Sequence, residues 1–227
     1  MDLLQAIAAS SRPGINAPRL VLVTAPATEP VTLAEANLWL KLDTTDDDDL
    51  VTELIKAARR VFEEITGRTL IDTVYRAEWD GLPRVGTYAG AATSRELELP
   101  RAPLKASSPV AWVKYSADDS SGTETTFASA NYTVDAGRDP NRFPRLWLNE
   151  SADWPDLGSF PGALRCQFTA GYGAAASDVP EEIKVCLKLL LTHLHTNRAP
   201  INVGNIVNEV PYTLKFLLEN LTIRSLA

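Results

Sequence analysis

The hydrophobic pattern is most regular between residues 50 and 65. Apolar side chains recur there every three or four positions, and at 100° per residue they fill a continuous arc of about 160°. Polar side chains occupy the other side, so the segment is predicted to form a long amphipathic helix. Gly67 follows, where a glycine in the left-handed conformation commonly ends a helix. The apolar arc contains Leu50, Val51, Leu54, Ile55, Ala57, Ala58, Val61, Phe62 and Ile65, and the polar side contains Thr52, Glu53, Lys56, Arg59, Arg60, Glu63 and Glu64.

A shorter helix is predicted just before it, over residues 31–42. Thr32 and Glu35 have the spacing of a capping box, in which the hydroxyl accepts a hydrogen bond from one backbone amide and the carboxylate accepts one from the cap residue. Four apolar side chains define one face of this helix: Leu33, Ala36, Trp39 and Leu40.

Helical periodicity returns between residues 177 and 198. Ser177 or Asp178 is expected to cap this helix, Pro180 lies near its first turn, and acids at 181 and 182 face the positive end of its dipole. Most of its circumference is apolar, which predicts the most buried helix of the protein. The polar stripe contains only Glu181, Lys184, Lys188, Thr192 and His195.

The long middle part of the chain has a composition typical of β-strands. Short runs rich in β-branched and aromatic residues are separated by clusters of Pro, Gly, Asp and Ser, which is typical of an antiparallel meander or a small barrel. Segments 82–95 and 116–125 are small, polar and aperiodic, so they are expected to be mobile loops. The predicted strands lie within 70–79, 96–99, 110–116, 131–135, 145–148 and 164–172.

Together these elements predict an α+β protein. Its core is expected to contain four helices, with an antiparallel β insertion between the second and the third. Because the helical segments are far apart in sequence, they can share a core only by packing together in space. The expected divisions are an extended N-terminal arm with one strand (1–30), the helical core (31–69 plus 174–221), the β insertion (70–173) and a C-terminal tail (222–227).

Composition and charge narrow the functional classes. The chain has 227 residues, 45% of them hydrophobic, and a formal charge of −7. A domain that grips nucleic acid usually presents a basic face, because phosphate neutralisation supplies most of the binding free energy. We therefore expect that this protein does not bind DNA that passes close to it. Two cysteines, no basic signal-peptide region and no apolar run of about 18–20 residues indicate a cytoplasmic or cytoplasmically assembled product without a membrane anchor.

The acidic run at positions 46–49 has two interpretations. A calcium loop would need alternating ligands, a central glycine and a distant glutamate, and this segment has no glycine. A helix start needs nothing further, because carboxylates there meet unpaired amides and the positive end of the dipole. We interpret the run as a helix start capped by Thr45 or Asp46, with a metal or partner site as the alternative.

No set of residues indicates catalysis, a metal or a cofactor. His193 and His195 diverge by about 200° on a helix, whereas helical zinc pairs lie four residues apart. Cys166 and Cys186 lie in apolar surroundings typical of core residues. The chain has neither a phosphate-binding glycine loop nor a Gly-x-Ser-x-Gly nucleophile motif.

Six segments in order resemble the tailed-phage head–tail connector, or adaptor, proteins. The resemblance covers residues 30–198 and includes both N-terminal helices, several strands and the third helix. The segments are "PVTLAEANLWLKLD", "DDDDLVTELIKAARRVFEEITGRTLI", "LELPRAPLKASSPVAWVKY", "NYTVD", "CQFTAGYG" and "DVPEEIKVCLKLLLTHLHTNR".

This resemblance implies a non-enzymatic part of a virion or of a phage-like particle, assembled in the host cytoplasm. Adaptors form a ring, usually of twelve subunits, below the portal protein. The ring extends the DNA channel without specific DNA binding and docks the stopper or tail-completion protein. Two other classes stay open at this point: a carboxylate-dependent hydrolase whose acids converge only in the fold, and a free-standing regulatory or chaperone-like interaction module.

The segment after the third helix is predicted to bind the portal. A linker at 199–210 leads to a short amphipathic helix over 211–221, which offers more apolar surface than an unpartnered tail should expose. Adaptors bind the portal with their C-terminal region, so the resemblance supports the same prediction. The alternative is that the helix folds back onto its own bundle. The candidate portal-binding residues are Tyr212, Leu214, Phe216, Leu217, Leu218 and Leu221.

Overall fold

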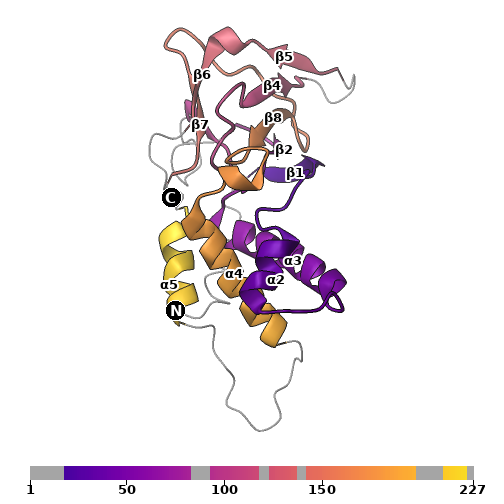
Figure 1. Cartoon of the computed structure of the whole chain (residues 1–227). Helices are drawn as coiled ribbons and strands as arrows, with labels where there is room; N and C mark the ends of the chain where they lie inside the picture. Colours follow the sequence, from indigo (N-terminus) through magenta and orange to yellow (C-terminus); the bar gives the residue numbers. More distant parts are fainter. Residues whose placement is uncertain (1–17, 83–92, 118–122, 137–141, 198–211, 224–227) are drawn as a thin grey trace. The chain divides into compact units, whose positions relative to one another are not determined.

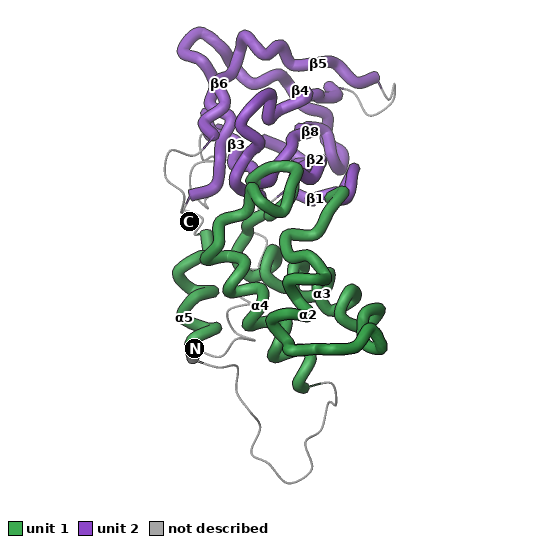
Figure 2. Tube along the Cα trace, viewed as in Figure 1, with its two compact units in different colours: residues 1–11, 26–71, 172–223 green, residues 12–25, 72–171, 224–227 purple. Residues whose placement is uncertain are grey.

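The computed structural model describes residues 18–82, 93–117, 123–136, 142–197 and 212–223. The chain divides into two compact units, drawn in different colours in Figure 2. Among the described residues, 26–71 and 172–223 form a helical unit, and 18–25 and 72–171 form a β unit.

The helical unit contains four α-helices within the described residues (Figure 1). Together with the antiparallel sheets of the β unit, they confirm the predicted α+β class. The helices are α2 (Leu33–Leu40), α3 (Asp48–Thr66), α4 (Glu181–Thr196) and α5 (Tyr212–Leu221).

The predicted capping box of α2 is present. The Glu35 amide donates to the Thr32 hydroxyl at 3.2 Å, and the Thr32 amide donates to the Glu35 carboxylate at 2.8 Å. This backbone hydrogen bond keeps the pKa of Glu35 below its usual value despite partial burial. Lys41 ends the helix in the left-handed conformation, with φ of 57°.

Helix α3 begins slightly later than predicted. Asp47 is its N-cap, and neither Thr45 nor Asp46 has that role. The Asp47 side chain makes no capping bond; instead a backbone turn precedes the helix, with the Asp48 amide donating to the Thr45 carbonyl. The predicted end is confirmed, because Gly67 has φ of 71° and its amide donates to Glu63.

The polar side of α3 is less exposed than its pattern predicted. Arg59 and Glu63 are buried, and the Arg59 guanidinium contacts Glu63 at 3.0 Å and Glu29 at 2.7 Å. Glu63 also accepts a hydrogen bond from the Leu70 amide. The helical wheel missed this burial because the covering residues lie outside the helix. At the other edge, Val61 of the predicted apolar arc is exposed.

The start of α4 also differs from the prediction. Its N-cap is Pro180, whereas Ser177 and Asp178 lie in a preceding 3₁₀ turn. The Asp178 carboxylate accepts from the Ala175 amide within that turn. The helix packs against α2, α3 and α5, as expected for a central helix. Lys184 of the predicted polar stripe is buried, with its ammonium group 2.9 Å from Glu181.

One apolar cluster joins the helices and the segments between them. Phe62 of α3 and Leu191 of α4 are among its largest buried side chains, and Leu214 and Leu218 of α5 complete it. Segments separated by more than a hundred residues therefore share one core, which stabilises each amphipathic helix by burying its apolar face.

The β unit is built from two antiparallel sheets. The first has the strand order β1-β2-β8-β4-β5, and the second has the order β3-β7-β6. The strands of the first are β1 (Arg19–Thr24), β2 (Thr73–Trp79), β8 (Leu164–Ala170), β4 (Val110–Tyr115) and β5 (Thr125–Phe127), and those of the second are β3 (Glu96–Glu98), β7 (Arg145–Leu148) and β6 (Tyr132–Asp135).

The two sheets share a single core, so they pack face to face. Alternate side chains of β2 and β8, such as Tyr75 and Phe168, meet Leu97 of β3 and Leu146 of β7 in one buried cluster. The other side chains of each strand point away from this core, because successive residues of a strand face opposite sides.

Two strands differ from the predicted β insertion. Strand β1 precedes all the described helices in sequence, yet it pairs with β2 and forms an edge of the first sheet. Strand β5 lies at the end of the segment predicted to be a loop and pairs with β4. It has only three residues, and they directly follow a polar, aperiodic stretch, so composition did not indicate a strand there. The remaining predicted strands are confirmed.

Candidate assembly surfaces

The candidate portal-binding residues occupy different environments on α5. Leu214 and Leu218 are buried in the helical core, and Leu217 and Leu221 pack against it. Phe216 is 53% exposed. Tyr212 begins the helix, but its side chain lies outside the described residues. In this conformation α5 is folded back onto its bundle, and Phe216 is its large exposed apolar side chain.

Arg68 holds the end of α5 in place. Its side chain is buried and donates to the Leu221 carbonyl at 2.7 Å and to the Tyr172 hydroxyl at 2.9 Å. The Ile223 amide adds a bond to the Thr66 carbonyl at 2.8 Å. Carbonyls at a helix end have no intrahelical donor, so a buried guanidinium there satisfies them. Sequence analysis missed this role, since nothing local connects Arg68 with a segment 153 residues away.

The acidic run is a helix start, as interpreted. Asp48 and Asp49 lie in the first turn of α3, and Asp48 accepts a hydrogen bond from the Asn37 side chain at 2.7 Å, which ties α2 to α3. His195 of α4 lies 4.0 Å from Asp47. Across the described parts of the chain, no group of three or more His, Cys, Asp or Glu side chains is placed to hold a metal ion.

The buried carboxylates of the described residues are bound to arginines. Glu63 contacts Arg59, and Glu78 contacts both Arg19 and Arg76. Burial alone would raise the pKa of Glu78, but hydrogen bonds from the two arginines outweigh it and lower the pKa. A hydrolytic general acid requires a raised pKa, so neither the partners nor the shift favours the hydrolase hypothesis.

Both cysteines are buried free thiols. Burial raises the pKa of Cys166 far above its usual value and that of Cys186 to about 11. The thiolate is the reactive form, so these side chains act as core residues. His193 is only partly buried and contacts Asn197 at 3.3 Å.

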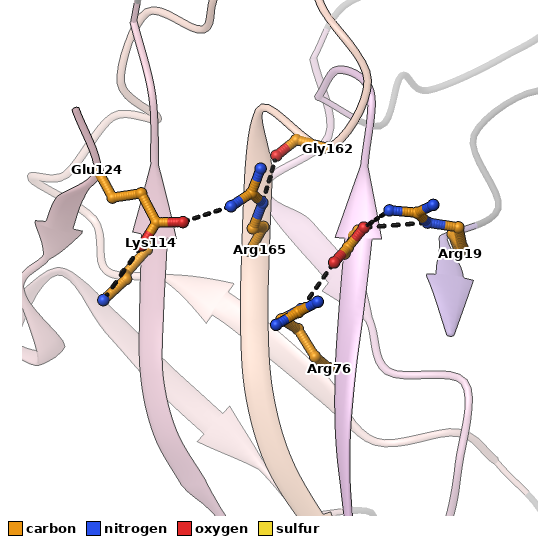
Figure 3. Close-up of polar contacts among 7 residues, drawn as sticks. Arg19, Arg76, Lys114, Glu124, Gly162 and Arg165 are labelled. Carbon is orange, nitrogen blue, oxygen red and sulfur yellow. Dashed lines mark hydrogen bonds and ion pairs between the residues drawn. The ribbon is translucent and has the colours of Figure 1, made fainter. Parts of the chain in front are cut away.

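The outward side of the first sheet carries two clusters of ion pairs (Figure 3). Glu78 binds Arg19 and Arg76, whereas Glu124 binds Lys114 and Arg165. Glu124 lies just before β5. The other five side chains come from neighbouring strands in register, because Arg19 lies opposite Glu78, and both Glu78 and Lys114 lie opposite Arg165. The two clusters therefore lie beside each other on the outward side of the sheet, between β1 and β4. We call these six residues the basic face, since they comprise four cations and two anions.

The outward side of the second sheet has the opposite charge. Arg145 contacts Glu96 and lies opposite both Glu98 and Asp135. Trp147, between Glu96 and Thr133 in register, is 47% exposed. We call Glu96, Glu98, Asp135, Arg145 and Trp147 the acidic face.

Helix α2 presents a further apolar surface. Leu38 is 82% exposed, and the neighbouring Trp39 is exposed on one side. The Trp39 indole donates to the Thr192 hydroxyl at 2.9 Å, and the Lys188 ammonium lies 6.0 Å from the centre of its ring. The indole is thus held in place by α4 while part of its ring remains in solvent.

Comparison with known protein families gives a match over part of the chain. Residues 30–134 match the family described as Phage gp6-like head-tail connector protein. The resemblance to head–tail connector proteins found in the sequence is therefore confirmed over residues 30–134. None of the curated proteins compared with the chain matches it.

Three solved structures share the fold. A chain in the neck of the empty GTA particle, computed with C6 symmetry, is 23% identical with a TM-score of 0.69, and the match covers 92% of this chain and 98% of that one. A chain in the virion of the native gene transfer agent (GTA) particle is 24% identical with a TM-score of 0.65, covering 92% and 97%. A chain in the neck of the native GTA particle, computed with C12 symmetry, is 23% identical with a TM-score of 0.64, covering 92% and 98%.

Proposed function

We propose that this chain is a structural, non-enzymatic subunit of the neck of a phage or phage-like particle, where it connects head and tail. The observation that carries the proposal is the connector-family match over residues 30–134, supported by a fold shared over 92% of the chain with neck and virion chains of the GTA particle. No helix among the described residues is long and apolar enough to cross a membrane.

The subunits form a closed ring, which we expect to contain twelve copies. Neck structures of the GTA particle computed with C6 and C12 symmetry support a ring of this kind. In the proposed assembly the ring lies below the portal, extends the DNA channel and docks the stopper or tail-completion protein. Synthesis and ring assembly take place in the host cytoplasm.

Helix α5 is the proposed portal contact. Phe216 is exposed in the packed helix, whereas Leu214 and Leu218 become available only if the helix leaves its bundle. Release would break the bond from Arg68 to Leu221 and the bond from Ile223 to Thr66. The proposal therefore has two levels: contact through Phe216 in the packed state, and contact through the whole apolar face after release.

The ring is tested by native mass spectrometry and electron microscopy of the chain, alone and mixed with its portal protein. We expect a closed ring of twelve copies, alone or on the portal. A chain that stays monomeric in both conditions would contradict the proposed function.

The portal contact is tested by Phe216→Asp. Val185→Asp is the matched control, because Val185 is also an exposed apolar residue on a helix of the same unit. We expect the Phe216 variant to fold and to lose portal binding, while the control keeps it. Equal portal binding by the wild type and the Phe216→Asp variant would remove α5 in its packed state as the contact.

A further inference from the structure

The two outward faces of the β unit have opposite charge. The basic face has a formal charge of +2 from Arg19, Arg76, Lys114 and Arg165 against Glu78 and Glu124. The acidic face has a charge of −2 from Glu96, Glu98 and Asp135 against Arg145. Because the sheets share one core, these faces point in opposite directions from the same compact unit.

We propose that the β units of neighbouring copies stack head to tail, with the basic face of one copy against the acidic face of the next. This inference rests on the proposed ring and names its contact. A ring needs a heterologous interface, in which two different surfaces of the same chain are complementary. Two faces on opposite sides of one unit meet that requirement without any rearrangement of the chain.

The direction of the faces also fits the proposed copy number. A ring of twelve turns by about 30° from one subunit to the next, so the two contact surfaces of a subunit must be nearly parallel. The outer faces of two packed sheets are nearly parallel, since aligned sheets stack as layers about 10 Å apart. Surfaces at a steep angle would instead close a ring of few copies.

Each outward side also carries a tryptophan side chain. Trp147 is 47% exposed on the acidic face. On the basic face, Trp112 lies opposite Gln167, and the Lys114 ammonium is 4.9 Å from the centre of its ring. Tryptophan and arginine are enriched among residues that dominate binding energy at interfaces. The faces thus combine aromatic anchors with charges that set orientation.

DNA is a less suitable occupant of the basic face. The two carboxylates interleave with the cations, which leaves an excess of only two positive charges. Proteins that hold duplex DNA through its backbone neutralise about 6–10 phosphates. The rest of this chain carries −9, since the whole chain carries −7. Another copy of the same chain is the favoured partner.

The test reverses each face while leaving every carboxylate of the basic face with one arginine partner and keeping the ion pair of the acidic face. Arg19→Glu with Lys114→Glu turns the basic face to −2, yet Glu78 keeps Arg76 and Glu124 keeps Arg165. Glu98→Lys with Asp135→Lys turns the acidic face to +2, while Arg145 keeps Glu96. Lys56→Glu with Arg60→Glu on α3 is the control for the basic-face variant, because it makes the same charge change at exposed positions of the helical unit.

Sedimentation and native mass spectrometry then measure the protein concentration at which half of the chain is assembled, with the portal present if the wild type requires it. We expect each face variant alone to need at least about tenfold more protein than the wild type, whereas the control stays within about threefold. The two face variants mixed one to one should assemble together, because each then meets a face of opposite charge. High salt should weaken assembly of the wild type and of the mixture.

The outcomes separate this inference from the proposed function. A wild type that forms no oligomer in either condition contradicts the ring, and with it the stacking. A wild type that forms rings while both face variants assemble equally well contradicts the stacking alone. If a face variant does not fold, Trp147→Ala replaces it. We expect this variant to need about tenfold more protein than the wild type for half of the chain to assemble. Assembly at the same concentration as the wild type would contradict the stacking. Loss of DNA binding in the Arg19→Glu/Lys114→Glu variant with unchanged assembly would assign the basic face to DNA instead.

Discussion

Arg59, Arg68 and Glu78 are buried charged side chains whose partners decide their effect on stability. Arg59 lies between Glu29 and Glu63, Arg68 binds backbone and hydroxyl oxygens, and Glu78 lies between two arginines. The attraction between a buried charge and its partners offsets much of its desolvation cost, but removing one partner leaves the other desolvated and unpaired. Single substitutions at these positions should therefore have larger effects than substitutions of exposed charges.

The first prediction concerns Arg68. Replacing it with Ala removes the donors to the Leu221 carbonyl and the Tyr172 hydroxyl, and we expect a loss of about 2–3 kcal/mol in the free energy of unfolding. Urea denaturation measures this loss, and amide hydrogen exchange should show faster opening of α5 than of α3. The control is Arg60→Ala at an exposed position, with an expected change within about 0.5 kcal/mol. Equal stability of the two variants would show that Arg68 does not hold the helix.

The second prediction concerns the pH dependence of stability. The pKa of Glu78 is lowered from 4.5 in the folded protein, so the folded state favours the ionised carboxylate. The stabilisation is present above pH 4.5 and is lost as the pH falls through the folded pKa. Glu78→Gln should therefore be less stable than the wild type at pH 7, with the difference shrinking below about pH 4. Thermal unfolding from pH 7 to pH 3 measures this difference, and Glu150→Gln at an exposed position is the control. A stability difference between the wild type and Glu78→Gln that grows on acidification would contradict the prediction.

At the scale of elements, helix ends are fixed by different devices. Helix α2 has a complete capping box, whereas α3 begins without a side-chain cap bond and relies on a backbone turn and on acidic residues in its first turn. At the end of helix α5, the Leu221 carbonyl accepts a hydrogen bond from Arg68, which lies just after the end of α3. The two long amphipathic helices α3 and α4 bury their apolar sides against each other and against the shorter ones.

The third prediction concerns the acidic start of α3. Replacing the four aspartates at 46–49 with Asn removes favourable charge–dipole interactions, so stability should fall by about 1–2 kcal/mol in total. Asn can still accept the bond that Asp48 receives from Asn37. Chemical denaturation gives the stability, and sedimentation gives the assembly state, which should be unchanged. Loss of the ring at unchanged stability would instead identify the run as an interface.

At the scale of the whole molecule, charge is distributed unevenly. A net charge of −7 coexists with a basic sheet face, whose cations are tied into pairs with Glu78 and Glu124. An acidic chain keeps phosphates at a distance, which suits the proposed role of the ring as a channel through which DNA moves. The proposed stacking would cover the basic face in the ring and leave the remaining negative charge to meet DNA.

The fourth prediction follows from this distribution. The purified chain should bind duplex DNA with a dissociation constant weaker than about 1 µM at about 150 mM salt, because few phosphates can be neutralised. Fluorescence anisotropy with a labelled duplex measures this, and repeating it at lower salt tests the electrostatic origin. Tighter binding at about 150 mM salt would contradict a channel that conducts DNA without holding it.

The sequence by itself determined the class of the protein and most of its local structure. The period of apolar residues in α3, the capping box of α2 and the glycine after α3 are local signals, because helix geometry places residues three and four apart on one face. Every described strand except β5 was also visible through its composition. The order of these segments was enough to find the resemblance to head–tail connector proteins, which is confirmed over residues 30–134.

Only the tertiary structure decided which side chains leave water and which segments pair. Strand β1 joins β2 across about 50 residues, and Arg68 reaches Leu221 across 153, so no local pattern could reveal either contact. The burial of Arg59 and Glu63 likewise depends on what covers the polar side of α3. The same holds for α5, where an amphipathic sequence allows both packing and partner binding. Its buried Leu214 and exposed Phe216 are distinguished only by the bundle it joins, because burial depends on neighbours from the whole chain.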